Sequence, residues 1–159
     1  MDKMKDEKFM LRAIREARRN LSSLDGGPFG ACIVKNGEVV AVGRNTVLTE
    51  DASCHAEINA IRNASKKLKT YDLSGCVIYS TTEPCPMCFS AIHWARIDAV
   101  TFGTGISDAR KIGFRELCIS ARNMKKMGKS PIRIVSGFML KECRRLFDDW
   151  EELDGKRIY

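Results

Sequence analysis

Hydrophobic residues recur at helical spacing in the first part of the chain, with Arg and Lys between them. The recurring apolar positions are Met10, Ile14, Ala17 and Leu21. This periodicity is typical of an amphipathic helix, which we expect over residues 6–22. The segment Asp25-Gly26-Gly27-Pro28 ends the helix, because Gly and Pro together break a helix and permit a sharp turn.

The pattern then changes to short apolar runs with β-branched residues, which predict strands. Residues 29–35 and 38–43 are expected to form a hairpin, since Asn36-Gly37 between them is a preferred two-residue turn in which both positions tolerate φ > 0. Three later runs predict further strands, at residues 76–81, 99–103 and 132–135.

Helical spacing returns in the rest of the chain. We expect a helix over residues 54–68 with Ser53 as its N-cap, and another from near Pro86. Residues 114–127 are also expected to be helical, and a closing helix begins near Phe138. The apolar residues of this closing helix are Cys143, Leu146, Phe147 and Trp150.

Two antiparallel strands followed by alternating strands and helices predict a mixed sheet with helices on both faces. The expected fold class is therefore α/β, a three-layer α/β/α sandwich around a mixed five-stranded sheet. The 159 residues suffice for one domain with a buried core, and no repeat, low-complexity segment or linker divides the chain. We interpret residues 1–159 as a single domain.

The net charge is +7, from 27 Lys and Arg against 20 Asp and Glu. This balance is compatible with a polyanionic partner but identifies none. The basic residues are dispersed, mostly over the polar sides of expected helices, where a solvated face is the commoner meaning. Nucleic acid is therefore the less favoured partner.

Two further properties bear on the compartment. No run approaches the roughly 20 apolar residues that a membrane helix requires, and Met1 begins a charged segment rather than a signal peptide. The seven cysteines are odd in number and form no framework of regular pairs. We expect a cytoplasmic protein without a membrane segment, in which most cysteines are small apolar residues.

The strongest chemical signal lies in two short motifs. His55-Ala56-Glu57 offers an imidazole and a carboxylate, and Glu83-Pro84-Cys85-Pro86-Met87-Cys88 offers two thiols that one tight turn can aim at a single point. One His and two Cys are an accepted ligand set for catalytic Zn²⁺, with the fourth position left to water. A carboxylate such as Glu57 can then carry protons for that water. His-x-Glu followed by Pro-Cys-x-x-Cys is the signature of zinc nucleobase deaminases.

Other interpretations of these motifs are weaker. A redox pair needs no His-x-Glu upstream, and a structural zinc site needs two further ligands although the chain has only two histidines. A zinc-stabilised binding or scaffold protein would not need Glu57. Cys54 is adjacent to His55, but if His55 and Glu57 face the cavity, Cys54 should point elsewhere.

The chain resembles the cytidine and deoxycytidylate deaminase superfamily over nearly its whole length, and within it most resembles the bacterial guanine deaminases. Besides the two metal motifs, the segments that carry the resemblance are Gly26-Gly27-Pro28-Phe29-Gly30-Ala31, Gly43-Arg44-Asn45, Ala91-Ile92-His93-Trp94-Ala95-Arg96 and a C-terminus ending in Tyr159. The resemblance implies the cytidine deaminase-like fold, one zinc ion per chain and a nucleobase substrate.

It also implies the reaction, which is hydrolysis of guanine to xanthine and ammonia. In that reaction zinc-bound hydroxide attacks the amino-bearing ring carbon, and Glu57 shuttles the protons. Asn45 matches the family's substrate-binding asparagine, whose amide can hold a carbonyl beside a ring N–H, and the backbone N–H of Ala56 adds a contact. Phe29 and Trp94 either enclose the ring by stacking or pack in the core.

Glu116 stands where guanine deaminases place a second acidic residue, which reads the outer edge of the purine and helps with protons. Many carry Asp there, one methylene shorter. The alternative is a surface residue on a helix. The resemblance further implies a homodimer, in which the C-terminal segment of the neighbouring subunit covers the pocket and gives Tyr159 and Trp150 a lid role.

Other substrates stay open. They are adenosine in transfer RNA, cytosine, guanosine and triazines such as ammeline. Deamination in transfer RNA would need a basic funnel at the pocket mouth, and the dispersed charge argues against one. Members that act on transfer RNA also usually have a Val-Pro pair in place of Pro28-Phe29.

Overall fold

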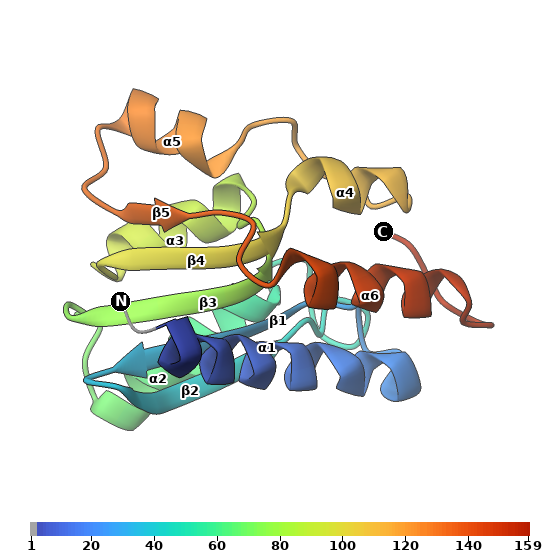
Figure 1. Ribbon diagram of the computed structural model, residues 1–159, viewed down its shortest axis with the longest axis horizontal. Helices are drawn as coiled ribbons and strands as arrows, with labels where there is room; N and C mark the ends of the chain where they lie inside the picture. Colours follow the sequence, from blue (N-terminus) through green and yellow to red (C-terminus); the bar gives the residue numbers. More distant parts are fainter. Residues whose placement is uncertain (1–2) are drawn as a thin grey trace.

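The computed structural model describes residues 3–159, and one five-stranded mixed sheet forms its centre (Figure 1). The strands are β1 (Gly30–Lys35), β2 (Glu38–Arg44), β3 (Cys76–Thr82), β4 (Ala99–Thr104) and β5 (Arg133–Val135). They lie in the order β2-β1-β3-β4-β5, with β1 antiparallel to β2 and β3, and with β3, β4 and β5 parallel. The predicted hairpin is confirmed, with φ of 53° at Asn36 and 77° at Gly37.

Helices cover both faces of the sheet, which confirms the expected three layers (Figure 1). They are α1 (Lys3–Ser23), α2 (Ala56–Leu68), α3 (Pro86–Trp94), α4 (Ile106–Lys111), α5 (Ala121–Gly128) and α6 (Leu140–Glu151). One core lies between the sheet and α1 with α6, and the other lies between the sheet and α2 with α3. None of the helices in the described range is long and apolar enough to cross a membrane.

Side chains along β3 alternate between the two faces of the sheet, so they contribute to both cores and, at the end of the strand, to its polar edge. Ile78 packs with the residues of α2 and α3, whereas Tyr79 packs with those of α1 and α6. Successive strand residues point to opposite faces, so Ser80 and Thr82 lie on the α2 side at the carboxyl end of β3. Both are buried, with 2% and 5% of their surface exposed. This end of the strand is where the two metal motifs meet.

The prediction for residues 114–127 is wrong in its first half. The chain forms α4 before this segment, and α5 begins only at Ala121. Between the two helices, Gly113 has φ of +103° and Phe114 turns into an apolar cluster with Trp150, while Leu117 is 63% exposed. The tertiary contacts of Phe114 therefore outweigh the weak helical preference of the local sequence.

Of two predicted helix starts, the first differs from expectation and the second lies near its predicted position. Ser53 caps no helix, because its hydroxyl donates to the Asp51 carboxylate at 2.6 Å and His55 takes the N-cap position of α2. The closing helix α6 begins at Leu140. Phe138 lies before it, and its N–H donates to the Phe102 carbonyl at 2.9 Å beside the sheet.

Close approach at two glycines sets the distance between helices and sheet. A Cβ at Gly30 would lie 2.0 Å from the carbonyl oxygen of Ala13 in α1, and one at Gly43 would lie 2.4 Å from that of Ala56 in α2. Neither separation is possible without movement of the helix. The contact at Gly43 matters most for the site, since Ala56 stands between His55 and Glu57.

We expect Gly43→Ala to lower the free energy of unfolding by about 2 kcal/mol or more, because the added methyl group would push against the α2 backbone. Urea unfolding followed by circular dichroism measures the change. Gly128→Ala is the matched control, since no atom lies within 4 Å of its Cβ position. That variant should stay within about 0.5 kcal/mol of the unsubstituted protein. Equal stability of the two variants would contradict the close approach of α2.

Candidate active site

The two metal motifs meet where α2 and α3 begin. His55 is the N-cap of α2, with φ −67° and ψ 157°, and Cys85 is the N-cap of α3, with φ −64° and ψ 169°. Pro86 follows at the start of α3, where a proline has no intrahelical N–H bond to lose. Cys88 lies in the first turn of α3, so its side chain returns to the same place as that of Cys85.

The three ligand atoms have the spacing that zinc requires. His55 Nδ1 lies 3.7 Å from Cys85 Sγ and 3.6 Å from Cys88 Sγ. With Zn–N of about 2.0 Å and Zn–S of about 2.3 Å, a tetrahedral arrangement separates nitrogen and sulfur by about 3.6 Å. All three ligand atoms lie within 4.8 Å of one another. The donors therefore fit a Zn²⁺ ion and leave one coordination position for water.

Cys85 is set up to be a thiolate. A hydrogen bond from the Cys88 side chain, together with the contact to His55, lowers the pKa of Cys85 to about 4 in spite of burial. Its place at the start of α3 adds the positive end of the helix dipole. The thiolate is the form in which cysteine binds a metal.

Glu57 lies beside the three metal-ligand atoms but is not one of the ligands. Its carboxylate accepts hydrogen bonds from Ser80 Oγ at 3.0 Å and from Cys88 Sγ at 3.5 Å. Burial raises the pKa of Glu57, and the nearby Cys85 raises it further. A carboxyl group with a raised pKa holds a proton more readily than an exposed one, which suits an acid–base role.

A small cavity of about 20 Å³ adjoins these groups. Seven of its wall residues were expected from the sequence, namely His55, Glu57 and Cys85 of the metal motifs together with Phe29, Asn45, Glu116 and Tyr159. Three others were not selected as site residues, namely Ser80, Thr82 and Glu83. Ser80 and Thr82 did carry a signal, because they are polar residues two apart at the end of an otherwise apolar strand.

Asn45 is held in place by a residue that sequence reasoning missed. Asn45 is 1% exposed, and its Oδ1 accepts from the N–H of Val47 at 3.1 Å. Asn20, from α1, donates to the Asn45 carbonyl at 2.7 Å and to the Gly27 carbonyl at 2.8 Å. The signal for Asn20 was its position on the buried stripe of α1, where a polar side chain must find partners.

Glu116 reaches the cavity from the loop between α4 and α5, so it is not on a helix, and its side chain is partly buried. Burial raises its pKa to about 7, and the nearby Cys85 adds to the rise while His55 opposes it. At neutral pH the protonated and ionised forms are then both accessible. Two carboxyl groups, Glu57 and Glu116, thus share one cavity with the metal ligands.

The C-terminal residue lines the cavity of its own chain. The Tyr159 hydroxyl accepts from the N–H of Gly27 at 3.1 Å, and the Tyr159 carbonyl accepts from the N–H of Arg115 at 3.3 Å. Its ring packs edge-on against Phe114 with centroids 5.3 Å apart. Phe29 lies against the same Phe114 ring at 4.9 Å, so it both packs and lines the cavity. These contacts of Tyr159 are consistent with a lid role for the C-terminal segment.

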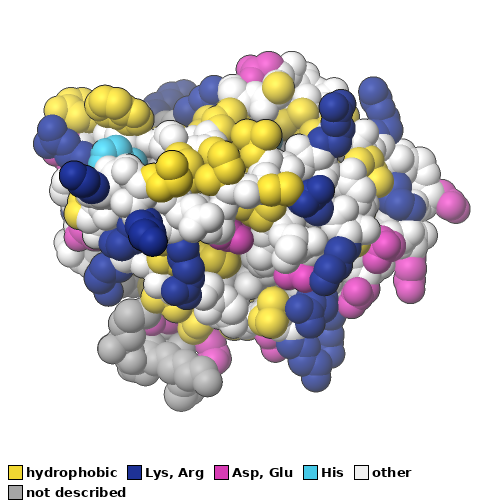
Figure 2. All heavy atoms as spheres, turned by 90° about the horizontal axis from the view of Figure 1, so that it is seen from above, with side chains coloured by type: hydrophobic (Ala, Val, Ile, Leu, Met, Phe, Trp, Pro, Cys, Tyr) yellow, Lys and Arg dark blue, Asp and Glu magenta, His cyan; other side chains and the backbone are white. Residues whose placement is uncertain are grey.

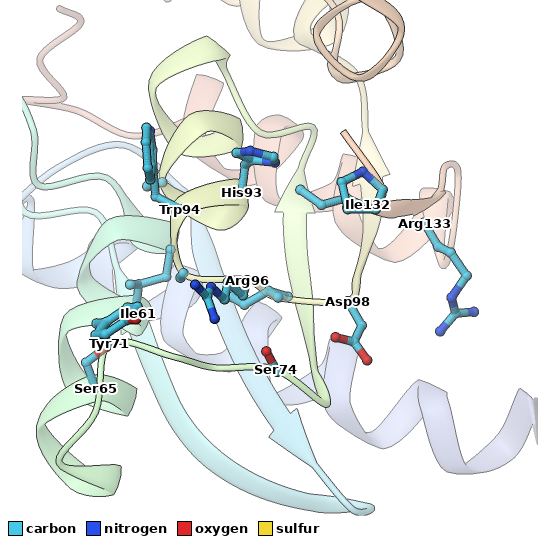
Figure 3. A pocket seen from close by; sticks show the side chains of 14 residues that line it. Ile61, Ser65, Tyr71, Ser74, His93, Trp94, Arg96, Asp98, Ile132 and Arg133 are labelled. Atoms are coloured by element: carbon cyan, nitrogen blue, oxygen red, sulfur yellow. The ribbon is translucent and has the colours of Figure 1, made fainter. Parts of the chain in front are cut away.

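Two tryptophans do not take the expected places. Trp94 is 79% exposed and lines a separate groove of about 1140 Å³ with Tyr71 and Arg96 (Figure 3). Within one chain it neither stacks on a base in the cavity nor packs in the core. Trp150 is fully buried with Phe114 and Phe147, so it belongs to a core cluster and not to the lid.

The two residues next to His55 also have defined surroundings. Ala56 is buried and is the first residue of α2, so its N–H is one of the helix-start amides without an intrahelical partner. Cys54 is buried as well, and its sulfur accepts from the Arg62 guanidinium at 3.2 Å. Cys54 therefore points away from the ligand group, as expected.

Residues 3–104 match the family model described as the cytidine and deoxycytidylate deaminase zinc-binding region. The chain is 39% identical over 157 residues to the guanine deaminase of Bacillus subtilis (strain 168), covering 98% of this chain and 100% of the relative. It is 42% identical over 99 residues to the tRNA-specific adenosine deaminase of the same organism, covering 62% of this chain and 61% of that relative.

A solved structure of another guanine deaminase is also similar to this chain. The guanine deaminase from Nitrosomonas europaea superposes with a TM-score of 0.84 at 28% identity, covering 92% of this chain and 85% of that one. Similarity to the guanine deaminases therefore extends over the segment that carries Glu116, beyond the region matched by the family model.

We expect Cys88→Ser to lose most of its bound zinc, because the change removes one of three protein ligands. The metal content of the purified, dialysed protein, measured by inductively coupled plasma mass spectrometry, checks this. Cys54→Ser is the control, since it alters a buried cysteine next to His55 that points away from the site. It should retain about one zinc ion per chain. Equal zinc loss in both variants would remove Cys88 from the ligand set.

Proposed function

The chain belongs to the cytidine and deoxycytidylate deaminase family of zinc-dependent hydrolytic enzymes, and we propose that it converts guanine and water to xanthine and ammonia. One observation carries the choice of guanine. A second carboxyl group, Glu116, lines the cavity that holds the His55, Cys85 and Cys88 group together with Glu57. The full-length similarity to a guanine deaminase supports the same substrate.

His55, Cys85 and Cys88 would hold the zinc ion, which would acidify a bound water molecule enough to make it a nucleophile near neutral pH. Glu57 takes a proton from that water and passes protons to a ring nitrogen of the base and to the departing amine. The hydrogen bond from Ser80 keeps Oε1 of Glu57 in place, and Oε2 lies 3.5 Å from Cys88 Sγ, beside the metal ligands. The oxygen ends on the amino-bearing carbon, and the amine leaves as ammonia.

Recognition of the base rests on groups from four separate parts of the chain. Asn45 can hold a ring carbonyl and the adjacent N–H with its amide, and the N–H of Ala56 adds a donor at the start of α2. Phe29 supplies an aromatic wall. Glu116 accepts from the amino group and a ring N–H, an arrangement that adenine and cytosine do not offer. Its raised pKa also allows it to help with proton movement.

The C-terminal tail must move for the base to enter. A cavity of about 20 Å³ has room for about one water molecule, whereas a purine is several times larger. Tyr159 is held by its hydroxyl at Gly27, by its backbone oxygen at Arg115 and by its ring against Phe114. Release of these contacts would let the tail withdraw and then return over the bound base, which excludes water from the reaction.

Transfer RNA is the main competing substrate, because a tRNA-specific adenosine deaminase is 42% identical over part of the chain. A tRNA substrate would need an open pocket mouth inside a continuous basic surface. Here the cavity is small, and Tyr159 of the tail forms part of its wall. On the face drawn in Figure 2, Lys and Arg side chains are scattered among apolar and acidic ones. These features favour a free base over a polynucleotide.

We also propose that the protein acts in purine metabolism as a cytoplasmic homodimer whose subunits can exchange their C-terminal tails. The seven cysteines are all free, which suits a reducing compartment. The exposed Trp94 and Tyr71 on the groove of Figure 3 give an apolar surface for a second subunit. Tail exchange would replace the contacts of Tyr159 with Gly27, Arg115 and Phe114 of its own chain by the same contacts in the partner.

Replacement of Glu116 by Gln should lower turnover of guanine by well over tenfold, because the amide cannot accept from the base with two equivalent oxygens or exchange a proton. Release of ammonia gives the rate, and the zinc content should not change. Glu152→Gln makes the same substitution at an exposed position and should leave the rate as it was. An unchanged rate in the Glu116 variant would remove that residue from the site.

Truncation of the lid, Tyr159→Ala, should raise KM for guanine about tenfold or more, since the ring that covers the base and its bond to Gly27 are lost. Steady-state kinetics measures KM, and zinc content should be unaffected because Tyr159 lies outside the ligand group. Tyr159→Phe keeps the ring and should fall between the two. A KM for Tyr159→Ala equal to that of the unsubstituted protein would exclude a lid role.

A further inference from the structure

Glu83 lies in the cavity wall two residues before Cys85, and nothing in the mechanism above uses it. Both of its carboxylate oxygens accept hydrogen bonds from backbone amides. Oε2 accepts from the N–H of Ile106 at 3.2 Å, and Oε1 accepts from the N–H of Ala121 at 2.9 Å. Ile106 is the first residue of α4 and Ala121 is the first residue of α5. One side chain therefore binds the starts of two helices.

The segment between these helices carries Glu116. Residues 112–120 form neither helix nor strand, so regular backbone hydrogen bonds do not fix their place. Glu83 secures the helix start that precedes the segment and the one that follows it. The N–H of Arg115 is bonded to the carbonyl of Tyr159, so the middle of the segment depends on the tail that must move when substrate enters.

Glu83 itself is placed by the sheet. Its N–H donates to the Thr104 carbonyl at 2.8 Å, which extends the parallel pairing of β3 and β4 by one step. It follows β3 directly and stands two residues before the zinc ligand Cys85. The same short stretch of chain therefore sets the position of a metal ligand and anchors both ends of the loop that carries Glu116.

We propose that Glu83 is a positioning residue for the deamination: it fixes the loop that carries Glu116 at a set distance from the zinc ligands, also while the C-terminal tail is withdrawn. This inference rests on the proposed function, because it assigns Glu83 its effect through Glu116. Glu83 has no contact with the reacting atoms in this role.

Only an ionised carboxylate can accept both of these backbone hydrogen bonds at once. Its two oxygens accept from two separate N–H groups, and hydrogen bonds to a charged acceptor are stronger than neutral ones. The negative charge also lies at two helix starts, where the helix dipoles favour it. In Glu83→Gln the shape is kept, but the side-chain NH₂ would face one of the two backbone N–H donors, so one bond is lost.

Asp108 provides a matched control. Its Oδ2 accepts from the N–H of Gly105 at 3.0 Å, so it also bonds at the start of α4. Its other oxygen lies 3.8 Å from Lys111 Nζ and 3.9 Å from Arg144. Asp108 has no bond to α5 and does not line the cavity. Asp108→Asn therefore makes the same change from acid to amide at α4 alone.

Amide hydrogen exchange on the zinc-loaded protein tests the positioning directly and needs no activity. In Glu83→Gln, exchange should become at least about tenfold faster in residues 105–123, because the lost bond frees the starts of α4 and α5. The zinc content and the exchange of α2 should be unchanged, and Asp108→Asn should not accelerate exchange in residues 114–123. Unchanged exchange of residues 114–123 in Glu83→Gln would overturn the proposal.

Kinetics then tests whether Glu83 acts through Glu116. Glu83→Gln should lower kcat/KM for guanine by about ten- to a hundredfold, since a misplacement of about 1 Å at a catalytic group can cost that much. The double variant Glu83→Gln/Glu116→Gln should be no slower than Glu116→Gln alone, within about twofold, because the anchor has nothing left to position. If the losses of kcat/KM in the two single variants multiplied in the double variant, the proposal would be overturned.

A second variant covers the case in which Glu83→Gln does not fold. Ala121→Pro removes the N–H that bonds to Glu83 and keeps the carboxylate, and proline is accepted at the first position of a helix. Ser120 before it has φ −69° and ψ 154°, a conformation that a following proline allows. This variant should reproduce the faster exchange of residues 114–120 and the kinetic loss, with zinc retained. Slow exchange and full activity would overturn the proposal.

The outcomes separate this inference from the proposed function. If the unsubstituted, zinc-loaded protein releases no ammonia from guanine, the proposed function fails, whatever the Glu83 variants do. If it releases ammonia and Glu83→Gln is as active as Asp108→Asn, only the positioning role fails.

Discussion

The structure depends on the convergence of two helix starts at the end of one strand. His55 caps α2, and Cys85 and Cys88 open α3, so three metal-binding atoms lie within 4.8 Å of one another. This spacing requires α2 to pack directly against β2, and Gly43 allows this contact because it has no side chain. The helix dipoles favour the thiolate that the metal needs. Packing in the core and chemistry at the site are therefore set by the same contact.

Around this fixed centre, the part of the site that selects the substrate is built from weaker restraints. Phe29, Asn45 and Glu116 lie on loops, and Tyr159 is the last residue of the chain. A cavity that holds about one water molecule must widen for a base, and loops are the segments that move at low free-energy cost. Such a design needs an anchor that does not move with the lid, and Glu83 meets that need because β3 and β4 hold its backbone.

Predictions from the sequence succeeded where local pattern and tertiary contacts agree. The hairpin at Asn36-Gly37 and the helices around Met10 and Ile58 follow from turn chemistry and periodicity. The prediction failed at residues 114–120, whose apolar residues suggested a helix. Phe114 is instead drawn into the cluster around Trp150, and the rest of the segment becomes the loop that presents Glu116. Trp94 shows the same limit, since its helical spacing gave no indication of its exposure.

The sequence by itself determined the chemistry, because His55, Glu57, Cys85 and Cys88 occur at spacings that few other functions require. It also determined the α/β class through the alternation of strands and helices. Only the tertiary structure decided which distant groups face that chemistry: Ser80 on Glu57, Asn20 behind Asn45, and Tyr159 over the cavity of its own chain. The physical reason is that these contacts join residues far apart in the chain, where no periodicity or local spacing relates one partner to the other.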